Sequence, residues 1–370
     1  MYLTCHKLLN YRNISEAVFN PIAEVNVICG NNGHGKTNLL ESIFLLTGAR
    51  SFRIGKDIAL INKQSDFSVI DSSFFSEGRT QSIKLKIVEK GRIASLNKGT
   101  EKKAAGIAGS FCCVVFSPEH LELVKGSPEI RRKFIDTAMC QISPGYLANL
   151  KKYTRLVNQR NRLLKDCAYV SAASEMLDVY DVQFIQAACA ITEQRITFIN
   201  ELIPIAEQNY TAISNGREQL FFSYESTLFH EQGVDFENGL ERLRAQRAIE
   251  QRCGFTTVGP HRDDIEIYLS GEEARIFASQ GQQRCIVLSL KLGEAELMER
   301  RLGERPVLLL DDVLSELDSD RQDYLIENIK NSQAIITCCE PELVINRASA
   351  CVFKMENGAL NSKFQRLPEV

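Results

Sequence analysis

A glycine-rich stretch near the amino end constrains this chain more than any other feature of its sequence. Residues 29–42 are CGNNGHGKTNLLES, so glycines and asparagines precede a single lysine and then an apolar run. The preceding run AEVNVI is β-prone, and TNLLESIFLLTG repeats apolar residues at helical spacing as far as Gly48. A strand, a glycine loop and a helix in this order predict a phosphate-binding loop.

The same residues fit the motif G-x-x-x-x-G-K-[ST]. We expect Lys36 to reach the β- and γ-phosphate oxygens of ATP and the Thr37 hydroxyl to bind Mg²⁺. A chance glycine turn is the alternative, and the flanking strand and helix argue against it. The predicted ATP-binding residues are Gly30, Asn31, Asn32, Gly33, His34, Gly35, Lys36, Thr37 and Asn38.

A second segment, RPVLLLDDVLSELD, supplies carboxylates. Its apolar residues 307–310 are typical of a strand buried on both faces of a parallel sheet, and the run ends in Asp311 and Asp312. At the carboxyl end of a strand, Asp311 is expected to be a Mg²⁺ ligand and Asp312 to orient or deprotonate the attacking water. A strand-end cap would explain one of them, but an acidic pair after an apolar strand needs a compensating charge. We therefore predict Lys36, Asp311 and Asp312 as catalytic residues.

A third segment, FASQGQQRCIVLSLKLGEAEL, places a polar glycine turn at the start of a predicted helix. A simple phosphate-loop enzyme does not need another such turn, whereas a second anion site does. The alternative is an N-capped helix with an incidental Gly-Gln turn. We predict a signature turn near residues 279–284 that consists of Ser279, Gln280, Gly281 and Gln282.

Composition limits the remaining possibilities. The chain has 370 residues, a net charge of -3 and twelve cysteines. The charge excludes a bulk polycation, so any nucleic-acid surface must be local. No cysteine pair or Cys/His cluster has metal spacing, and we expect the cysteines to be small buried hydrophobes in a reducing compartment. No apolar run approaches about 18 residues and the N-terminus lacks a signal-peptide h-region, so we expect a cytoplasmic protein without membrane contact.

These segments together give the chain a resemblance to the RecF family of DNA-repair proteins, relatives of the ABC and SMC ATPase heads. The phosphate loop, SQGQQR, LLLDDVLSELD and TTVGPHRDDIEI carry it. It extends through NYRN (10–13), GARSFR (48–53) and VFSPEHLELVKGSPEIRRKFID (115–136), so it covers nearly the whole chain. The GPHRDD and GSPxxRR segments make it specific, because ABC transporters are not expected to carry them.

The resemblance implies an α/β fold of the ABC/SMC type, a two-lobed ATPase head that dimerises when ATP lies between one subunit's phosphate loop and the other's signature turn. A phosphate loop and its metal-binding Asp share one sheet. We therefore expect residues 1–125 and 253–370 to form a discontinuous ATPase domain, lobe I. Residues 126–252 are poor in strand signals, so we predict a helical insertion, lobe II, with loops near NGREQ and HEQGVDFENG.

The resemblance also implies a function. It is that of an ATP-dependent DNA-binding protein of recombinational repair and replication restart, which binds double-stranded DNA near gaps. Such a protein would work with RecO- and RecR-like mediators to load RecA and would support the SOS response. Asp312 stands where most ABC ATPases have a catalytic glutamate, and its shorter side chain suggests slow hydrolysis. The resemblance thus implies a weak, DNA-stimulated ATPase that acts as a dimerisation switch. Thr337 stands where they have a switch histidine, which leaves the γ-phosphate sensor unassigned.

Two other classes of function remain as alternatives. An ATPase subunit that powers a transporter should show the switch histidine, and one that powers a nuclease should come with a metal-carboxylate domain. Neither feature is visible in the sequence. A structural SMC-like tether would need a long coiled-coil arm, and residues 126–252 are too few for one.

One predicted helix of the insertion, GYLANLKKYTRLVNQRNRLLKD, has a basic face opposite an apolar one. At about 100° per residue, four cations form what we call the basic stripe: Lys151, Arg155, Arg162 and Lys165. Four cations along a helix suit a DNA phosphate backbone, and a solvated helix face is the alternative. Arg160 falls on the apolar side, where it either pairs inside the fold or reaches the nucleotide.

Arg131, Arg132 and Lys133 follow a Gly-Ser-Pro turn at another predicted helix start. Cations oppose the helix dipole there, so either a DNA phosphate or a salt bridge to Glu129 or Asp136 explains them. Three further pairs are weaker candidates: Tyr11 and Arg12 for the adenine side, Arg50 and Arg53 for DNA, and His261 and Arg262 for an interlobe site.

Overall fold

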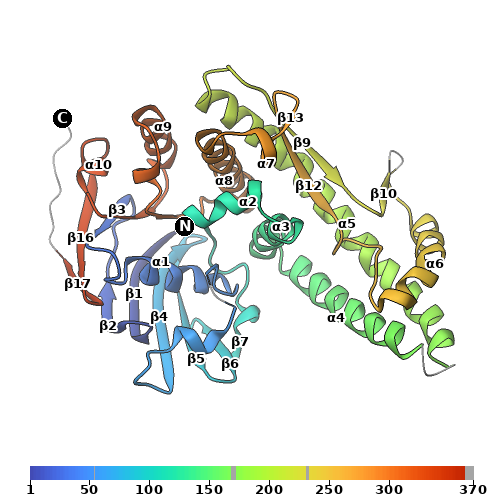
Figure 1. Cartoon of the computed structure of the whole chain (residues 1–370). Helices are drawn as coiled ribbons and strands as arrows, with labels where there is room; N and C mark the ends of the chain where they lie inside the picture. Colours follow the sequence, from blue (N-terminus) through green and yellow to red (C-terminus); the bar gives the residue numbers. More distant parts are fainter. Residues whose placement is uncertain (54, 168–171, 231–232, 363–370) are drawn as a thin grey trace.

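The structure of the chain is a computed structural model that describes residues 1–53, 55–167, 172–230 and 233–362. Figure 1 shows two sheets and their covering helices on one side and an arm of long helices on the other. The mixed α/β fold predicted from the sequence is confirmed.

The central sheet carries the segments that the sequence picked out for phosphate and metal. Five of its six strands are parallel, and the edge strand formed by residues 359–362 is antiparallel. Its short apolar strands are buried on both faces, as expected for a parallel sheet covered on both sides. In spatial order they are β17 (Ala359–Ser362), β16 (Ala350–Glu356), β3 (Val25–Cys29), β15 (Ala334–Cys338), β14 (Val307–Asp311) and β8 (Cys113–Phe116).

A second six-stranded sheet is antiparallel and alternates buried and exposed residues, so one of its faces packs on the core. The sequence indicated strands here but not a separate sheet. Its strands are β2 (Ile14–Phe19), β1 (Tyr2–Tyr11), β4 (Phe67–Ser76), β5 (Arg79–Val88), β6 (Gly91–Leu96) and β7 (Lys102–Lys103). Helix α1 (Lys36–Phe44) contributes Leu39 and Ile43 to the apolar cluster shared by the two sheets.

Further helices complete this part of the molecule. The α-helices are α2 (Glu122–Lys125), α7 (Ala274–Phe277), α8 (Gln280–Leu302), α9 (Ser319–Ile329) and α10 (Glu342–Ile345). The 3-10 helices are η1 (Leu45–Thr47), η2 (Asp57–Leu60), η3 (Ala104–Gly106), η4 (Pro118–Leu121) and η5 (Leu314–Glu316). Helix α1 and η1 together end at Gly48, as the periodicity predicted.

The middle of the chain is mainly helical. Its helices are α3 (Pro128–Ile142), α4 (Pro144–Asp166), α5 (Ala172–Ile213) and α6 (Phe236–Cys253), and α4, α5 and α6 form the arm in Figure 1. The segment also contains strands that the periodicity missed: β9 (Leu220–Glu225), β10 (Phe229–His230) and β11 (Gly233–Val234). Strand β9 pairs with β12 (Asp264–Leu269), which pairs with β13 (Glu272–Glu273). Part of the predicted HEQGVDFENG loop, residues 231–232, lies outside the described residues, and the lobe boundaries stay a prediction.

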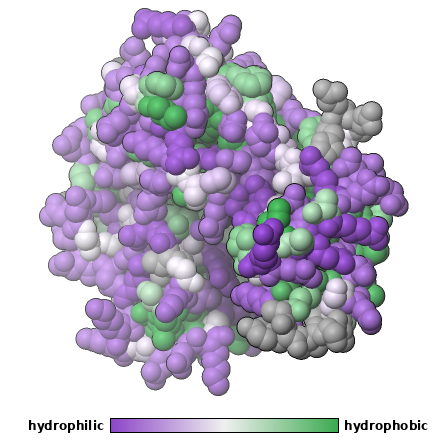
Figure 2. All heavy atoms as spheres, turned by 45° about the vertical axis from the view of Figure 1, so that its right-hand side comes forward, coloured by the Kyte–Doolittle hydropathy of each residue, from purple (hydrophilic) through white to green (hydrophobic). Residues whose placement is uncertain are grey.

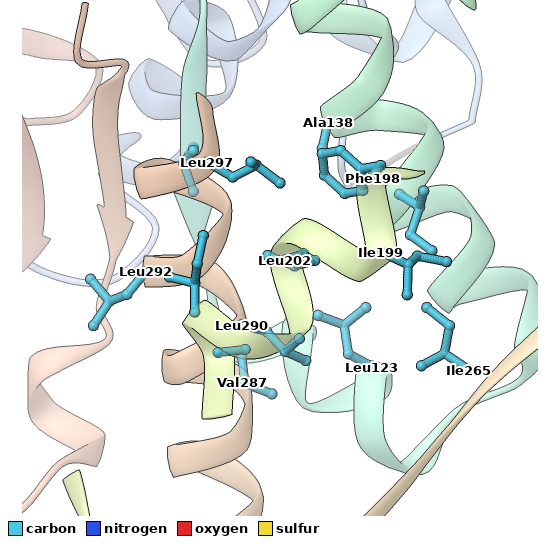
Figure 3. Packing of buried hydrophobic residues seen from close by; sticks show 14 of the residues in the cluster. Leu123, Ala138, Phe198, Ile199, Leu202, Ile265, Val287, Leu290, Leu292 and Leu297 are labelled. Atoms are coloured by element: carbon cyan, nitrogen blue, oxygen red, sulfur yellow. The ribbon is translucent and has the colours of Figure 1, made fainter. Parts of the chain in front are cut away.

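The arm and the central sheet share one apolar core. Figure 3 shows Phe198 and Leu202 of α5 among side chains from α2, α3 and α8. A Cβ added at Gly293 of α8 would lie 3.2 Å from Leu202 Cδ1, so the glycine lets α5 and α8 approach closely. The helix that begins with the signature turn is therefore packed directly on the longest helix of the arm.

Candidate functional site

The predicted phosphate-binding loop, residues 30–37, connects β3 to α1. Gly30 and Gly35 have φ values of 148° and 107°, a region that residues with a side chain rarely adopt. A Cβ at Gly30 would also lie 2.3 Å from the Met355 carbonyl oxygen of β16. The bare backbone is therefore required at this position by both conformation and space.

The Lys36 side chain is almost fully buried, with 7% of its surface exposed. Its Nζ donates to the carbonyl oxygens of Gly30 at 2.5 Å and Asn31 at 3.3 Å, and it lies 3.6 Å from Cys339 Sγ. The lysine thus folds back over its own loop. Sequence reasoning did not place Cys339 here, although its position directly after β15 is a signal that could have indicated it.

Thr37 and Asp311 meet where β14 ends beside α1. Thr37 Oγ1 donates to Asp311 Oδ1 at 2.8 Å, and Thr337 Oγ1 of β15 donates to the same oxygen at 2.8 Å. Burial raises the pKa of the Asp311 carboxyl, and the two hydroxyl donors oppose that shift. The structure brings together the two residues predicted to hold Mg²⁺ and adds Thr337 to them.

Asp312 has a positive φ of 53°, which is uncommon for a residue with a side chain. The Asp312 N–H donates to the Thr337 carbonyl oxygen at 3.1 Å, and Ser315 Oγ donates to the Asp312 carbonyl oxygen at 2.8 Å. These bonds fix the turn after β14, so that Asp312 lies at the same pocket as Asp311.

These groups surround one pocket of about 310 Å³. Seven of the nine predicted ATP-binding residues line it, and Gly30 and His34 do not. The lining residues are Arg12, Asn31, Asn32, Gly33, Gly35, Lys36, Thr37, Asn38, Arg53, Asp311, Asp312 and Thr337. The three predicted catalytic residues therefore share a single cavity, and their roles in it stay a prediction.

Arg12 and Tyr11 differ in their relation to this pocket. Arg12 lines it and forms an ion pair with Glu41 of α1 at 2.5 Å. Tyr11 has no exposed surface and donates to Glu41 Oε2 at 2.8 Å. Of the pair considered for the adenine side, only Arg12 faces the cavity.

Arg53 also lines the pocket, where its Nη1 donates to Asn38 Oδ1 at 3.0 Å. The sequence suggested a DNA contact for Arg53 and Arg50. The structure places Arg53 among the predicted ATP-binding residues instead, and Arg50 lines a different cavity beside α3.

The signature turn, residues 279–282, begins α8. Ser279 Oγ accepts from the Gln282 N–H at 3.3 Å, and Gln282 Oε1 accepts from the Ser279 N–H at 2.6 Å, so the two residues form a reciprocal N-terminal cap. Gln282 Nε2 also donates to Glu218. Ser279 and Gln280 are exposed. None of the four residues lines the pocket around Lys36.

The basic stripe lies on α4, whose predicted extent is confirmed. All four of its cations are exposed, and within the described residues no ion pair joins them to a carboxylate. Three of them line an open surface hollow of about 660 Å³ together with polar side chains of the same helix. The lining residues are Leu150, Lys151, Thr154, Arg155, Asn158, Gln159 and Arg162.

Arg160 of the same helix is fully buried. It forms ion pairs with Asp181 at 2.8 Å and Glu250 at 2.7 Å, so it pairs inside the fold and does not reach the nucleotide. These contacts connect α4 to α5 and α6.

The structure corrects the assignment of Arg131, whereas the DNA contact suggested for the half-buried Arg132 stays a prediction. Arg131 is buried and donates twice to Asp264 of β12, at 2.7 and 2.8 Å, and Arg132 donates to the Asp263 carbonyl oxygen at 2.6 Å. The salt-bridge partner is neither Glu129 nor Asp136. Because burial requires a fixed partner for each guanidinium, Arg131 is not available to DNA phosphates.

The GPHRDD segment, residues 259–264, contacts helices α4 and α5. His261 Nδ1 shares a hydrogen bond of 2.5 Å with Tyr153 of α4, and burial lowers the pKa of His261 to about 4. The Pro260 carbonyl oxygen accepts from Arg195 of α5 at 2.6 Å. Arg262 lies over the Phe255 ring, 4.9 Å from its centroid. These contacts fit a merely structural role for His261, and the interlobe site suggested by the resemblance stays a prediction.

The expectation for the cysteines holds for half of them. All twelve are free, and the buried ones are Cys112, Cys113, Cys189, Cys285, Cys338 and Cys351, whereas Cys253 and Cys339 are exposed. Among the described residues, no group of three or more His, Cys, Asp or Glu side chains could hold a metal ion. Nor does any described helix combine the length and apolar character needed to cross a membrane.

Comparisons with known proteins agree with this geometry. The family described as RecF/RecN/SMC N terminal domain matches residues 2–361. The chain is 37% identical over 355 residues to the DNA replication and repair protein RecF of Acetivibrio thermocellus, covering 94% of this chain and 95% of the relative. It is 36% identical over 371 residues to the protein of the same name from Bacillus subtilis, covering 97% and 100%.

Solved structures give the same result. A structure described as the recombination mediator protein RecF-ATP in the RecFOR pathway has a TM-score of 0.91 and 30% identity, over 98% of this chain and 97% of the other. An Smc head domain from Pyrococcus furiosus has a TM-score of 0.56 at 15% identity and covers 99% of this chain and 96% of the other, which supports the fold alone. The ABC/SMC type of head is thereby confirmed. The chain belongs to the RecF family of DNA replication and repair proteins.

Proposed function

We propose that this chain is an ATP-dependent DNA-binding protein of recombinational repair whose ATPase works as a dimerisation switch. One observation carries the proposal. The pocket brings the phosphate loop, with its Thr37, next to Asp311 of β14. The signature turn starts with exposed residues and does not line that pocket. Such a site holds a nucleotide within one chain but is completed by another.

The residues present fit Mg²⁺ and ATP. Gly30 and Gly35 keep the loop backbone free of side chains, and its N–H groups with the N-terminus of α1 suit a phosphate. Mg²⁺ needs few protein ligands when phosphates supply the rest, so Thr37 and Asp311 suffice to hold it. When bound, it would neutralise charge on the phosphates.

Besides the proposed Mg²⁺ ligand Asp311, hydrolysis would depend on two residues of the pocket. Lys36 exchanges its Gly30 carbonyl partner for phosphate oxygens, and Asp312 orients or deprotonates the attacking water. The Asp312 side chain is shorter than a glutamate, which supports a weak ATPase. Stimulation by DNA is part of the proposal, because the RecF relatives are named for DNA replication and repair.

DNA would contact the basic stripe, whose four cations are exposed and unpaired with carboxylates among the described residues. We place the action of the protein at double-stranded and gapped DNA, in the cytoplasm. The structural relative is described as a mediator of the RecFOR pathway. We therefore infer RecR- and RecO-like mediators as partners, with aid to RecA loading, replication restart and SOS induction as the outcome.

Binding to duplex, single-stranded and gapped DNA, measured with and without Mg²⁺-ATP across a salt series, tests this function. We expect duplex and gapped DNA to bind more tightly when Mg²⁺-ATP is present, with an affinity that falls as salt rises. DNA binding that is the same with and without nucleotide would contradict the proposal.

The variant Ser279→Arg tests the dimer switch separately. A bulky cation in the signature turn leaves the chain's own phosphate loop untouched, so ATP should still bind one subunit while ATP-induced dimers and hydrolysis disappear. Sedimentation with and without Mg²⁺-ATP measures this. A Ser279→Arg protein that still dimerises would show that the turn is only the helix cap seen at α8.

A further inference from the structure

Two large apolar side chains stand exposed immediately before the signature turn. Ile276 and Phe277 end helix α7, and only Ala278 separates them from Ser279. Each has 65% of its surface exposed, more than any other large hydrophobic residue in the described part of the chain.

Their exposure is not a consequence of a loosely packed segment. Ala274, at the start of the same helix, is fully buried, and the Ala278 N–H donates to the Ala274 carbonyl oxygen at 3.2 Å. Strand β13, which precedes α7, pairs with β12. The helix is therefore fixed to the core while its last two side chains point away from it. Single exposed apolar residues are common, and two adjacent ones at such exposure form a small apolar patch that a partner surface can cover.

The position of the signature turn determines what can cover them. In one chain the turn does not line the pocket around Lys36, so it can meet a nucleotide only on a second copy. A chain advances at most about 3.3–3.6 Å per residue, which keeps Phe277 within roughly 7 Å and Ile276 within roughly 11 Å of Ser279 along the backbone. Any copy that reaches the turn must therefore approach these two side chains.

We propose that Ile276 and Phe277 form an apolar anchor that a second copy of this chain covers when ATP joins the two subunits. This inference rests on the proposed function. The anchor has the composition of an interface centre with a polar rim, because Glu272 and Arg275 beside it are exposed and charged. In a dimer with twofold symmetry the same pair would be buried on both subunits.

Removal of the larger side chain tests the anchor. Phe277→Ser should weaken the Mg²⁺-ATP-dependent dimer by about 10- to 100-fold for each buried copy, the usual effect of losing one large apolar contact. ATP binding to the monomer should not change, since Phe277 does not line the pocket. The matched control is Val179→Ser on α5, which removes an apolar side chain with 62% exposure that lies far from the turn in the sequence.

The absence of tryptophan from the chain allows a second measurement. Phe277→Trp introduces a single reporter whose emission should shift to shorter wavelength on addition of Mg²⁺-ATP, in proportion to the dimer seen by sedimentation. Val179→Trp should not shift. Adding Ser279→Arg to the Phe277→Trp protein should abolish the shift, because the turn can then no longer reach the nucleotide.

The outcomes separate this inference from the function on which it rests. Suppose that the wild-type protein dimerises on ATP. If Phe277→Ser then dimerises equally well, or the tryptophan emission of the Phe277→Trp protein does not shift, the proposed anchor is wrong but the proposed ATP-dependent dimer is not contradicted. If the wild-type protein does not dimerise on ATP, both the proposed dimerisation switch and the proposed anchor are wrong. Weakening by Phe277→Ser alone, with a shift that depends on an intact Ser279, supports both.

Discussion

The nucleotide pocket and the basic stripe of α4 both collect groups that suit phosphate, but they hold them in different ways. In the pocket, Lys36, Thr37 and Asp311 are fixed by bonds to the backbone and to one another. On α4, the four cations are exposed and have no carboxylate partner in the described part of the chain. The first arrangement favours one ligand in one geometry, and the second favours any polyanion that can lie along the helix.

Helix α4 contains both kinds of cation. Arg160 is buried between Asp181 and Glu250, whereas Arg162, two residues further, is exposed without a carboxylate partner among the described residues. A buried guanidinium must be paired because desolvation is otherwise too costly, and an exposed one need not be. Pairing therefore distinguishes the cations that build the arm from those that remain free for a ligand.

The largest expected effect comes from the lysine of the pocket. Lys36→Met removes the charge predicted to reach the γ-phosphate, so ATP binding and all nucleotide-dependent function should be lost while the fold remains intact. ATP binding and thermal unfolding measure the two parts of this prediction, and Lys63→Met, an exposed lysine outside the pocket, is the control. Near-normal ATP affinity and activity in a folded Lys36→Met protein would refute the assigned site.

The second-largest expected effect separates the proposed roles of Asp311 and Asp312 in the pocket. Asp312→Asn keeps the shape of the side chain and the Asp311 metal ligand but loses the carboxylate next to the water, so hydrolysis should fall by about 10²- to 10⁴-fold. The ATP-induced dimer should persist and accumulate. Phosphate release and sedimentation measure both quantities, with the exposed Asp320→Asn as the control. Unchanged hydrolysis would remove Asp312 from the mechanism.

The third prediction compares the two cations of α4 directly. Arg160→Met leaves the buried Glu250 without its ion-pair partner and Asp181 with Arg247 alone, and it should cost about 3–5 kcal/mol of stability. Arg162→Met should change the free energy of unfolding by no more than about 0.5 kcal/mol. Urea denaturation measures both. Similar losses in the two variants would mean that pairing does not separate the structural cations from the free ones.

The smallest effect concerns the stripe itself. Each phosphate contact on B-DNA contributes about -0.9 to the slope of log K against log salt, so removing Lys151, Arg155 and Arg162 together should flatten that slope by up to about 3. ATP hydrolysis without DNA should survive. A variant that removes three exposed lysines outside α4, Lys63, Lys90 and Lys98, controls for net charge. An equal slope in the stripe variant and the wild type would leave the stripe as a solvated helix face.

The pocket could be predicted in large part from the sequence because its parts are local. A glycine loop between a strand and a helix, and an acidic pair after an apolar strand, each lie within about fifteen residues. The partners that complete the pocket are not local: Thr337 reaches Asp311 from a neighbouring strand, and Arg12 enters from the end of β1. Only the sheet topology brings these segments together.

The same limit explains the errors. The partner of Arg131 is Asp264, 133 residues away, whereas helical spacing offered only nearby acids. The sequence predicted strands in this region but not which strands pair with one another. The antiparallel pairing of β4 with β5 and of β5 with β6, which makes the second sheet separate from the first, is visible only in the structure. Strand β9 was missed because its partner β12 lies beyond helix α6 in the chain.

Helix α5 has 42 residues, so at about 1.5 Å per residue it is roughly 63 Å long. One part packs against α8, which starts at the signature turn, and another part packs against α4 and α6 in the arm. Figure 2 shows a mostly hydrophilic surface on the face where the arm comes forward. For a straight helix of this length, a tilt of about 5° at one end would move the other end by roughly 5 Å. A tilt of α5 where it packs against α8 would therefore displace α4 and α6 more than α8 itself.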